Sequence, residues 1–382
     1  MRISRGRARK ITAVTTLAAV VGIGPLVFLP INSAAAAPSE GGPVTYVNPK
    51  PGADRLPRIP ASSWVLADAD TGEILAAKEP HHQYPPASTI KVLTAVTLMP
   101  HLDLNSTYSA TFQDVNQAGT RIGLRAGMSN KVSDLFAGML MNSGNDAARA
   151  VANAAGGWEP SLRLMNEEAA RLGAKDTVAA TPNGLDRTEQ LTSAADLAII
   201  FREALKNPDI TKIFRTKTLD AQTVNGRLIH LYNHNKMLQL NYPGHLGAKT
   251  GTTSMAGKTV VSAFKRGNRT LIVALMRYGS TMERASKPLY DWGFANAKKV
   301  EPVGQLPTVG PRPPVTPRPA LQVDENGTPK SGQDELLAAV APTANSSSGV
   351  NSSGAVTVLL LFAAAAGAVF GLMRWRARKP TA

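Results

Sequence analysis

The chain has 382 residues, 43% of them hydrophobic, which is enough for one large folded domain or two average ones. It contains no cysteine, which excludes disulfide bonds, thiolate metal sites and cysteine nucleophiles. The formal net charge is +15, but nine of the positive charges lie in the first ten and last nine residues, and the rest of the chain carries only +6. A modestly basic body of this kind serves solubility, so we expect no nucleic-acid partner.

The first 37 residues have the pattern of a secretory signal peptide. Five basic residues within the first ten precede an apolar run over 11–31 and then the small residues 33–37, where a signal peptidase would cut. Two prolines in the apolar run disfavour a long-lived spanning helix, so cleavage near Ala37 is preferred over an uncleaved anchor. Residues 38–60 are rich in Pro and Gly and are expected to form a flexible leader.

From residue 61 the hydrophobic pattern predicts strands, then helices, then strands again. Residues 64–68 and 74–78 are strand-like around the turn 70–72, and the strand pattern returns after His245. Between them, apolar residues recur at helical spacing in runs that end at Gly or before Pro. We expect helices near 90–99, 132–141, 147–155, 162–172 and 193–207, a hairpin of strands 259–264 and 270–276, and a closing helix near 282–294.

These elements indicate an α/β fold with one folded domain over 61–296. Strands at both ends of the domain, with helices between them, suggest a single antiparallel sheet built from the two ends of the chain and flanked by helices, with an inserted helical lobe. We expect the catalytic groups to line the seam between the sheet and the lobe.

The chain after residue 296 divides into three parts by composition. Residues 297–354 are rich first in Pro and then in Ser, Asn and Gly, and are expected to form an extended stalk. Residues 355–373 carry no charge, and a helix of this length spans about 28 Å, close to the roughly 30 Å of a bilayer core. The basic tail 374–382 is then cytoplasmic by the positive-inside rule. We therefore expect a single-pass cell-membrane protein with an extracellular catalytic domain on the cell-wall side.

The first of three candidate motifs is Ser88-Thr89-Ile90-Lys91, which puts a hydroxyl and an amine three residues apart on one helix face. The two prolines at 85–86 predict that the helix begins near Ser88, so that its N-terminus favours negative charge on the oxygen. Burial and nearby cations would lower the pKa of Lys91 and make it a base. A second Ser-x-x-Lys, from Ser262 to Lys265, lies in a predicted strand, where its ends point to opposite faces, and is interpreted as structural.

The second motif, Ser143-Gly144-Asn145, is the only Ser-x-Asn in the chain and lies between two predicted helices. From such a turn, the hydroxyl could pass a proton to a departing amine and the amide could hold a peptide carbonyl. Taken alone, the motif is better explained as a helix cap by Asn145 or Asp146.

The third motif is Lys249-Thr250-Gly251, near the start of the C-terminal strands. The ammonium of Lys249 and the hydroxyl of Thr250 suit a substrate carboxylate, and Gly251 leaves room for a substrate backbone along the strand. Taken alone, this segment could be an ordinary strand with an exposed lysine.

Together the motifs occur in a defined order, separated by 55 and 106 residues. The set Ser-x-x-Lys, Ser-x-Asn, Lys-Thr-Gly is that of penicillin-binding proteins and class A β-lactamases. Residues 61–296 resemble a low-molecular-mass penicillin-binding protein, a D-alanyl-D-alanine carboxypeptidase of the serine peptidase type with the β-lactamase/DD-peptidase fold. The residues that carry the resemblance are 86–91, 141–147, 181–185 and 247–253.

The resemblance implies removal of the terminal D-alanine from peptidoglycan stem pentapeptides through an acyl-enzyme on Ser88. Lys91 would take the proton of Ser88, and Ser143 would relay a proton to the leaving D-alanine. Asn145 would bind the substrate peptide. The backbone N–H groups of Ser88 and Thr252 would hold the oxyanion, and Lys249 with Thr250 would bind the terminal carboxylate.

The resemblance also implies that β-lactams act as covalent inhibitors and that no metal or other cofactor is needed. Many members of the family carry a separate β-rich domain after the catalytic one, where this chain has only its Pro-rich segment. Whether water or an amine accepts the acyl group stays open at this level. The alternatives are a class A-like β-lactamase, against which no convincing Glu-x-x-Leu-Asn segment is present, and a non-catalytic β-lactam sensor or wall-binding scaffold.

Overall fold

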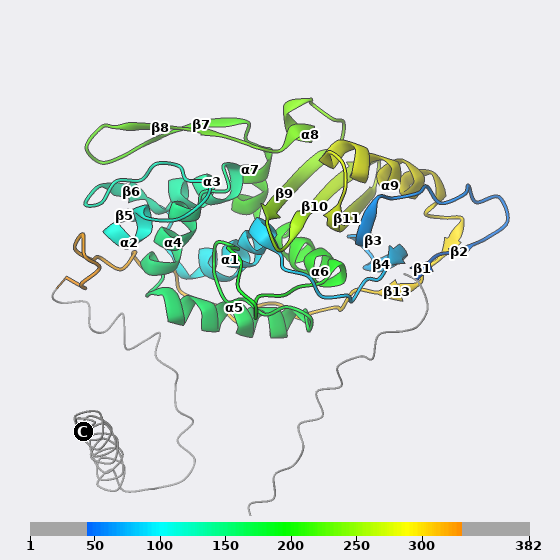
Figure 1. The fold of residues 1–382 in the computed structure, drawn as a ribbon, viewed down its shortest axis with the longest axis horizontal. Helices are drawn as coiled ribbons and strands as arrows, with labels where there is room; N and C mark the ends of the chain where they lie inside the picture. Colours follow the sequence, from blue (N-terminus) through cyan, green and yellow to red (C-terminus); the bar gives the residue numbers. More distant parts are fainter. Residues whose placement is uncertain (1–43, 331–382) are drawn as a thin grey trace, which may run out of the picture. The chain divides into compact units, whose positions relative to one another are not determined.

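The computed structural model describes residues 44–330, in which an antiparallel sheet is covered by helices on both faces (Figure 1). Its strands lie in the order β1-β4-β3-β11-β10-β9, and β13 also pairs with β4. Early and late segments of the described chain thus meet in one sheet, as the sequence predicts. The strands are β1 (Thr45–Tyr46), β3 (Ala61–Asp68), β4 (Glu73–Lys78), β9 (His245–Thr253), β10 (Gly257–Arg266), β11 (Arg269–Tyr278) and β13 (Gly304–Gln305).

Helices cover the two faces of the sheet, α6 on the side of the helical lobe and α9 on the other (Figure 1). The expected α/β fold with an inserted lobe is confirmed. The helices are η1 (Ala87–Ile90), α1 (Lys91–Leu98), η2 (Met99–His101), α2 (Phe112–Val115), α3 (Val132–Met141), α4 (Asn145–Ala154), α5 (Trp158–Leu172), α6 (Ala194–Ala204), α7 (Pro208–Arg215), α8 (Lys236–Gln239) and α9 (Met282–Asn296).

Three two-stranded sheets complete the described body, and the sequence patterns predicted none of them. The hairpin of β7 and β8 lies between α7 and α8, where the strands are short and half-exposed and carry little periodicity. The pairs are β2 (Asn48–Pro49) with β12 (Val300–Glu301), β5 (Thr107–Ser109) with β6 (Ser129–Lys131), and β7 (Thr218–Gln222) with β8 (Leu228–Tyr232).

The central strands β3, β4, β10 and β11 are largely buried on both faces, which explains their continuous apolar runs. In β3, Val65 and Ala67 pack into the core beneath the helical lobe, whereas Trp64 and Leu66 pack into the core beneath α9. Successive side chains of a strand point to opposite faces, so one strand supplies both cores. The sheet is therefore a rigid base for whatever lies along its edge.

Two predictions about the ends of the domain are wrong. The expected leader 38–60 is described from residue 44 onward, and there it forms β1 and β2 and buries Ile59. The expected stalk 297–354 is described up to residue 330, and over that stretch it lies on the body. Composition misled here because prolines weaken hydrogen-bonded ladders, whereas the apolar residues between them still bury surface against the body.

Residues 303–330, which we call the C-terminal strap, run back along the helical lobe (Figure 1). Leu306, Ala320 and Leu321 are buried in the same core as α1 and the other helices of the lobe. The strap also forms backbone hydrogen bonds with the body, among them one from Leu321 N–H to the carbonyl of Ala154. Over these residues the chain is therefore part of the folded domain.

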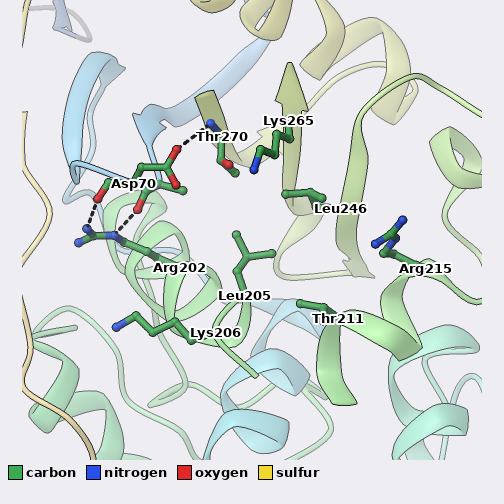
Figure 2. A pocket seen from close by; sticks show the side chains of 10 residues that line it. Asp70, Arg202, Leu205, Lys206, Thr211, Arg215, Leu246, Lys265 and Thr270 are labelled. Carbon is green, nitrogen blue, oxygen red and sulfur yellow. Dashed lines mark hydrogen bonds between the residues drawn. The ribbon is translucent and has the colours of Figure 1, made fainter. Parts of the chain in front are cut away.

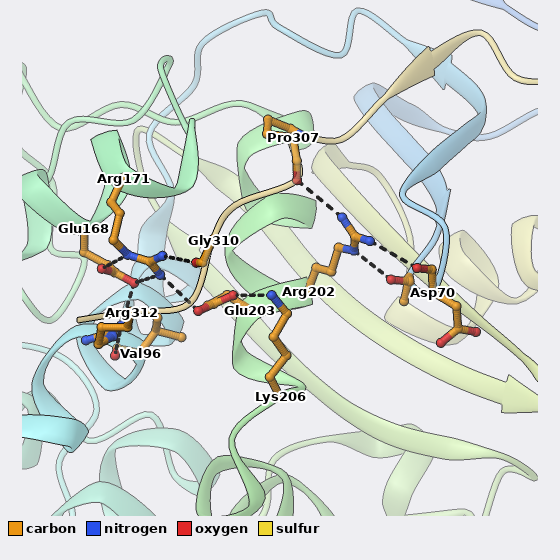
Figure 3. A network of polar contacts seen from close by, with 11 residues as sticks. Asp70, Val96, Glu168, Arg171, Arg202, Glu203, Lys206, Pro307, Gly310 and Arg312 are labelled. Atoms are coloured by element: carbon orange, nitrogen blue, oxygen red, sulfur yellow. Dashed lines mark hydrogen bonds and ion pairs between the residues drawn. The ribbon is translucent and has the colours of Figure 1, made fainter. Parts of the chain in front are cut away.

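Arg312 anchors the strap (Figure 3). Its guanidinium donates to Glu168 Oε1 at 2.5 Å, to the carbonyl of Val96 at 2.8 Å and to that of Thr97 at 3.3 Å. Glu168 is almost fully buried and also pairs with Arg171. Val96 and Thr97 belong to the last turn of α1, whose carbonyls have no partner within the helix. The strap thus caps the helix that begins at Lys91.

No helix within residues 44–330 is long and apolar enough to cross a membrane. The predicted signal peptide 1–37, the predicted transmembrane helix 355–373 and the basic tail 374–382 lie outside the described residues.

Arg312→Ala is expected to lower the free energy of unfolding by about 2 kcal/mol, because it removes a partner from a buried carboxylate and from two helix-end carbonyls. Urea unfolding measures the change. Lys287→Ala is the matched control, since Lys287 forms an exposed ion pair with Asp291 and its loss should cost less than about 0.5 kcal/mol. Equal effects of the two substitutions would contradict the anchoring role.

Candidate active site

Ser88 and Lys91 lie at the start of the helix that crosses the lobe, with Lys91 Nζ 2.8 Å from Ser88 Oγ. The expected α-helix begins at Lys91, and Ala87–Ile90 forms a 3₁₀ turn instead. In a 3₁₀ turn, residues three apart are eclipsed, so the amine lies directly beside the hydroxyl. Ala87 has a positive φ of 49°, a strained conformation typical of functional sites.

The amine of Lys91 is completely buried and lies among polar partners from separate segments. It donates to Asn145 Oδ1 at 2.7 Å and to the carbonyl of Asn183 at 2.5 Å. Burial, then the charge of Lys249, hold the pKa of Lys91 well below its usual value, while Asp146 opposes the shift. A neutral amine has two N–H bonds, and two pure acceptors occupy them. In that form its lone pair can accept the proton of the Ser88 hydroxyl, which lies within hydrogen-bond distance.

The Ser143-Gly144-Asn145 motif and the Lys249-Thr250-Gly251 motif are in direct contact. Lys249 Nζ donates to Ser143 Oγ at 2.9 Å and to the carbonyl of Thr250 at 2.7 Å. Burial lowers the pKa of Lys249 to about 7. Ser143 adopts a positive φ of 62°, the second strained residue of the site. The structure thus brings together the two lysines and the two serines that the sequence places far apart.

Asn145 is not a helix cap. It is the first residue of α4, and its side chain bridges Lys91 and the carbonyl of Ala118. Asp146 does not cap α4 either, since the N-cap is Gly144; its carboxylate accepts three backbone N–H groups from residues 122–124. The motif therefore positions side chains in the site and ties down the adjacent loop.

The strand that carries Lys249 presses against the Ser88 turn. A methyl group on Gly251 would lie 2.7 Å from Ser88 N, so only glycine allows this approach. On the next strand, Thr259 Oγ1 donates to the carbonyl of Pro86 at 2.8 Å and holds the turn against the sheet. β9 is the end strand of its sheet. Thr250 and Thr252 lie on this strand, partly and largely exposed, beside an edge that can pair with an extended peptide.

Sequence reasoning missed the role of residues 181–185, although they were part of the family resemblance. The carbonyl of Asn183 accepts from Lys91, and its side chain donates to Gln117. Gly184 has φ +83°, and a Cβ there would lie 2.1 Å from the carbonyl oxygen of Ala87. The Asn-Gly pair was a visible turn signal, but a backbone carbonyl as a ligand of the amine has no signature in the sequence.

The second Ser-x-x-Lys does not join the site. Ser262 is buried and hydrogen-bonded to Tyr290, whereas Lys265 is exposed. No group of three or more His, Asp and Glu side chains within residues 44–330 could hold a metal ion. The site consists of hydroxyls, amines, an amide and backbone groups, and these suit acyl transfer to a serine.

Comparisons with known proteins agree with this geometry. Residues 50–279 match the D-alanyl-D-alanine carboxypeptidase family. The chain is 40% identical over 248 residues to D-alanyl-D-alanine carboxypeptidase DacB2 of Mycobacterium tuberculosis, covering 63% of this chain and 84% of that protein. It is 34% identical to D-alanyl-D-alanine carboxypeptidase DacD of Escherichia coli, covering 64% of this chain and 66% of that protein.

Solved structures give the same result. A D-alanyl-D-alanine carboxypeptidase from Mycobacterium tuberculosis superposes with a TM-score of 0.63 at 39% identity, over 68% of this chain and all of that chain. The DD-transpeptidase of Streptomyces K15 superposes with a TM-score of 0.60 at 26% identity, over 63% of this chain and all of that one. The protein is a serine peptidase with a penicillin-binding fold. It belongs to the D-alanyl-D-alanine carboxypeptidase family, which is favoured over a β-lactamase or a non-catalytic scaffold.

The two lysines predict a bell-shaped pH dependence of kcat/KM for D-alanine release. Activity should rise with pH as Lys91 loses its proton, and fall above about pH 7 as Lys249 loses the charge that attracts a carboxylate. In Lys249→Arg the cation is permanent, so the alkaline limb should disappear while the acid limb remains, at a lower kcat because a guanidinium does not release a proton. An alkaline limb unchanged in this variant would contradict the assignment of Lys249.

Proposed function

We propose that this protein removes the terminal D-alanine from peptidoglycan stem pentapeptides and so takes part in building and remodelling the cell wall. One observation carries the proposal. The buried amine of Lys91, whose pKa is lowered by burial, lies 2.8 Å from Ser88 Oγ, beside a second lysine–serine pair. The similar proteins DacB2 and DacD are D-alanyl-D-alanine carboxypeptidases, which indicates the substrate class, D-alanyl-D-alanine peptides.

Acylation starts at Ser88, whose Oγ attacks the carbonyl between the two D-alanines while its proton passes to Lys91. The backbone N–H groups of Ser88 and Thr252 stabilise the oxyanion. The closeness of Gly251 to Ser88 N supports this arrangement, because it brings β9 and the Ser88 turn side by side.

Collapse of the tetrahedral intermediate breaks the C–N bond, and the nitrogen takes a proton from the hydroxyl of Ser143. Lys249, which donates to that hydroxyl, replaces the proton. The positive charge thus moves from Lys249 to Lys91 during acylation. Before deacylation, Lys91 loses this proton and Lys249 regains one. The neutral Lys91 then takes a proton from the attacking water and passes it to the oxygen of Ser88 as the ester bond breaks.

Binding depends on the free edge of β9. The charged form of Lys249 and the hydroxyl of Thr250 attract the terminal carboxylate, and Asn145 contacts the peptide. A β-lactam presents a carboxylate and a strained amide in the same relation, so it acylates Ser88 and acts as a covalent inhibitor. Water is the acceptor in this proposal.

The sequence supports a location for this activity, on the outer side of the cell membrane. A cleaved signal peptide over 1–37 exports the chain, and a helix over 355–373 anchors it with the tail 374–382 in the cytoplasm. Removal of residues 355–382 should move the enzyme from the membrane fraction to the medium, as measured by labelling with fluorescent penicillin. Retention in the membrane fraction would contradict the anchor.

Ser88→Ala should lower the rate of D-alanine release from a pentapeptide by at least about 10³-fold, because the nucleophile is lost. It should also abolish the covalent adduct that mass spectrometry detects after penicillin treatment. Ser262→Ala is the matched control, since it alters the other Ser-x-x-Lys, and should leave both readouts intact.

Each alternative gives a different result. Fast turnover of penicillin by the unaltered protein would favour a β-lactamase. Penicillin binding without release of D-alanine would favour a sensor or scaffold. Slow penicillin hydrolysis together with rapid D-alanine release supports the carboxypeptidase.

A further inference from the structure

A cavity of about 480 Å³ lies between α6, α7 and the adjoining ends of β9, β10 and β11, apart from the candidate active site (Figure 2). None of the residues of the candidate active site lines it. Its walls are strongly basic, with Arg202 from α6, Lys206 from the turn after it, Arg215 from α7 and Lys265 from β10. The cavity thus gathers four cations from three elements and a turn.

The negative charge around this cavity does not balance the positive charge. The only carboxylate that lines it is Asp70, which already accepts from the backbone N–H of Thr270. Lys206 pairs with Glu203, and that carboxylate is shared with Arg171 outside the cavity (Figure 3). Among the residues that line the cavity, four cations therefore face one carboxylate.

The individual cations differ in what they already contact. Arg202 donates to three backbone carbonyls, those of Ala69, Asp70 and Pro307, and so keeps its full charge. Arg215 and Lys265 form no ion pair and no side-chain hydrogen bond with any residue in the described part of the chain. Arg215 and Lys265 are thus free to bind a ligand. Arg202 is fixed in the cavity wall by its three backbone carbonyls.

Burial and the positive charge of the cavity together lower the pKa of a neighbouring histidine. His245 is mostly buried next to it, and burial followed by the charge of Arg215 lowers the pKa of His245 to about 4. Leu205 and Leu246 add apolar surface to the lining. An apolar wall reduces screening by water and strengthens the attraction of the cations for an anion.

We infer that this cavity binds a phosphate group carried on a small polyol or sugar. Arginine forks bind phosphate oxygens in pairs, and lysines on another wall can reach the remaining oxygens. The cavity is larger than one phosphate, and the leucine surface can contact the carbon skeleton beside it. The phosphate can belong to a free organic phosphate or to the phosphodiester chain of a polymer.

The test measures binding to the full-length protein in detergent by calorimetry, at low and moderate salt. The probes are glycerol 3-phosphate and poly(glycerol phosphate), with polyglutamate as a carboxylate control. The variant Arg215→Gln/Lys265→Gln removes the two free cations. The matched control Arg284→Gln/Lys298→Gln removes the same charge from exposed positions on or beside α9, across the sheet.

We expect at least one phosphate probe to bind, and its affinity to fall at least tenfold in the cavity variant but less than twofold in the control. The salt dependence should weaken in the cavity variant, because fewer ions are displaced on binding. D-alanine release from a soluble pentapeptide should be unchanged in both variants. Binding of the monomer indicates a free organic phosphate, and binding of the polymer alone indicates a phosphodiester chain.

Three results would overturn the inference. The first is no binding of either phosphate probe to the unaltered protein. The second is an equal loss of affinity in the two double variants, which would mean that only the net charge matters. The third is polyglutamate binding as tight as that of the phosphate polymer, which would show that the cavity does not select phosphate.

Discussion

The burial of one amine is the constraint on which the rest of the site depends. Lys91 has no access to water, and a buried amine must be neutralised or satisfied by hydrogen bonds. Asn145 and Asn183 meet this requirement from two other segments, and Ser88 completes the set. A single side chain therefore ties α1, α4 and the loop that carries Asn183 together. The same contacts that lower the cost of burial also direct the amine at its nucleophile.

Close approach of backbones completes this arrangement. Gly251 and Gly184 face the segment around Ala87 and Ser88 from two sides, at distances that exclude any side chain. The turn is thereby held between the sheet and the loop, which explains how it retains the positive φ of Ala87. Rigidity here comes from packing against a sheet with two buried faces. The exposed edge of β9 remains the open side of the site.

The C-terminal strap extends this rigidity to the far end of the catalytic helix. Arg312 and Glu168 form a buried ion pair beside the last carbonyls of α1, so that both ends of this helix are fixed by distant parts of the chain. A segment that composition marks as a stalk thus belongs to the folded domain up to residue 330. Its polar contacts also border the basic cavity, because the carbonyl of Pro307 holds Arg202.

The sequence by itself determined the family and the α/β class, and it predicted the site residues, because three short motifs and strong apolar periodicity are local signals. Helices such as α6, capped by Ser193, were predictable for the same reason. Three features could be recognised only in the tertiary structure. They are the hydrogen bond from Lys91 to the carbonyl of Asn183, the β7–β8 hairpin and the packing of the strap against the body. Backbone acceptors look alike at every residue, and short half-exposed strands show little periodicity. Pro-rich segments become ordered only when a surface distant in the chain is folded and ready to receive them.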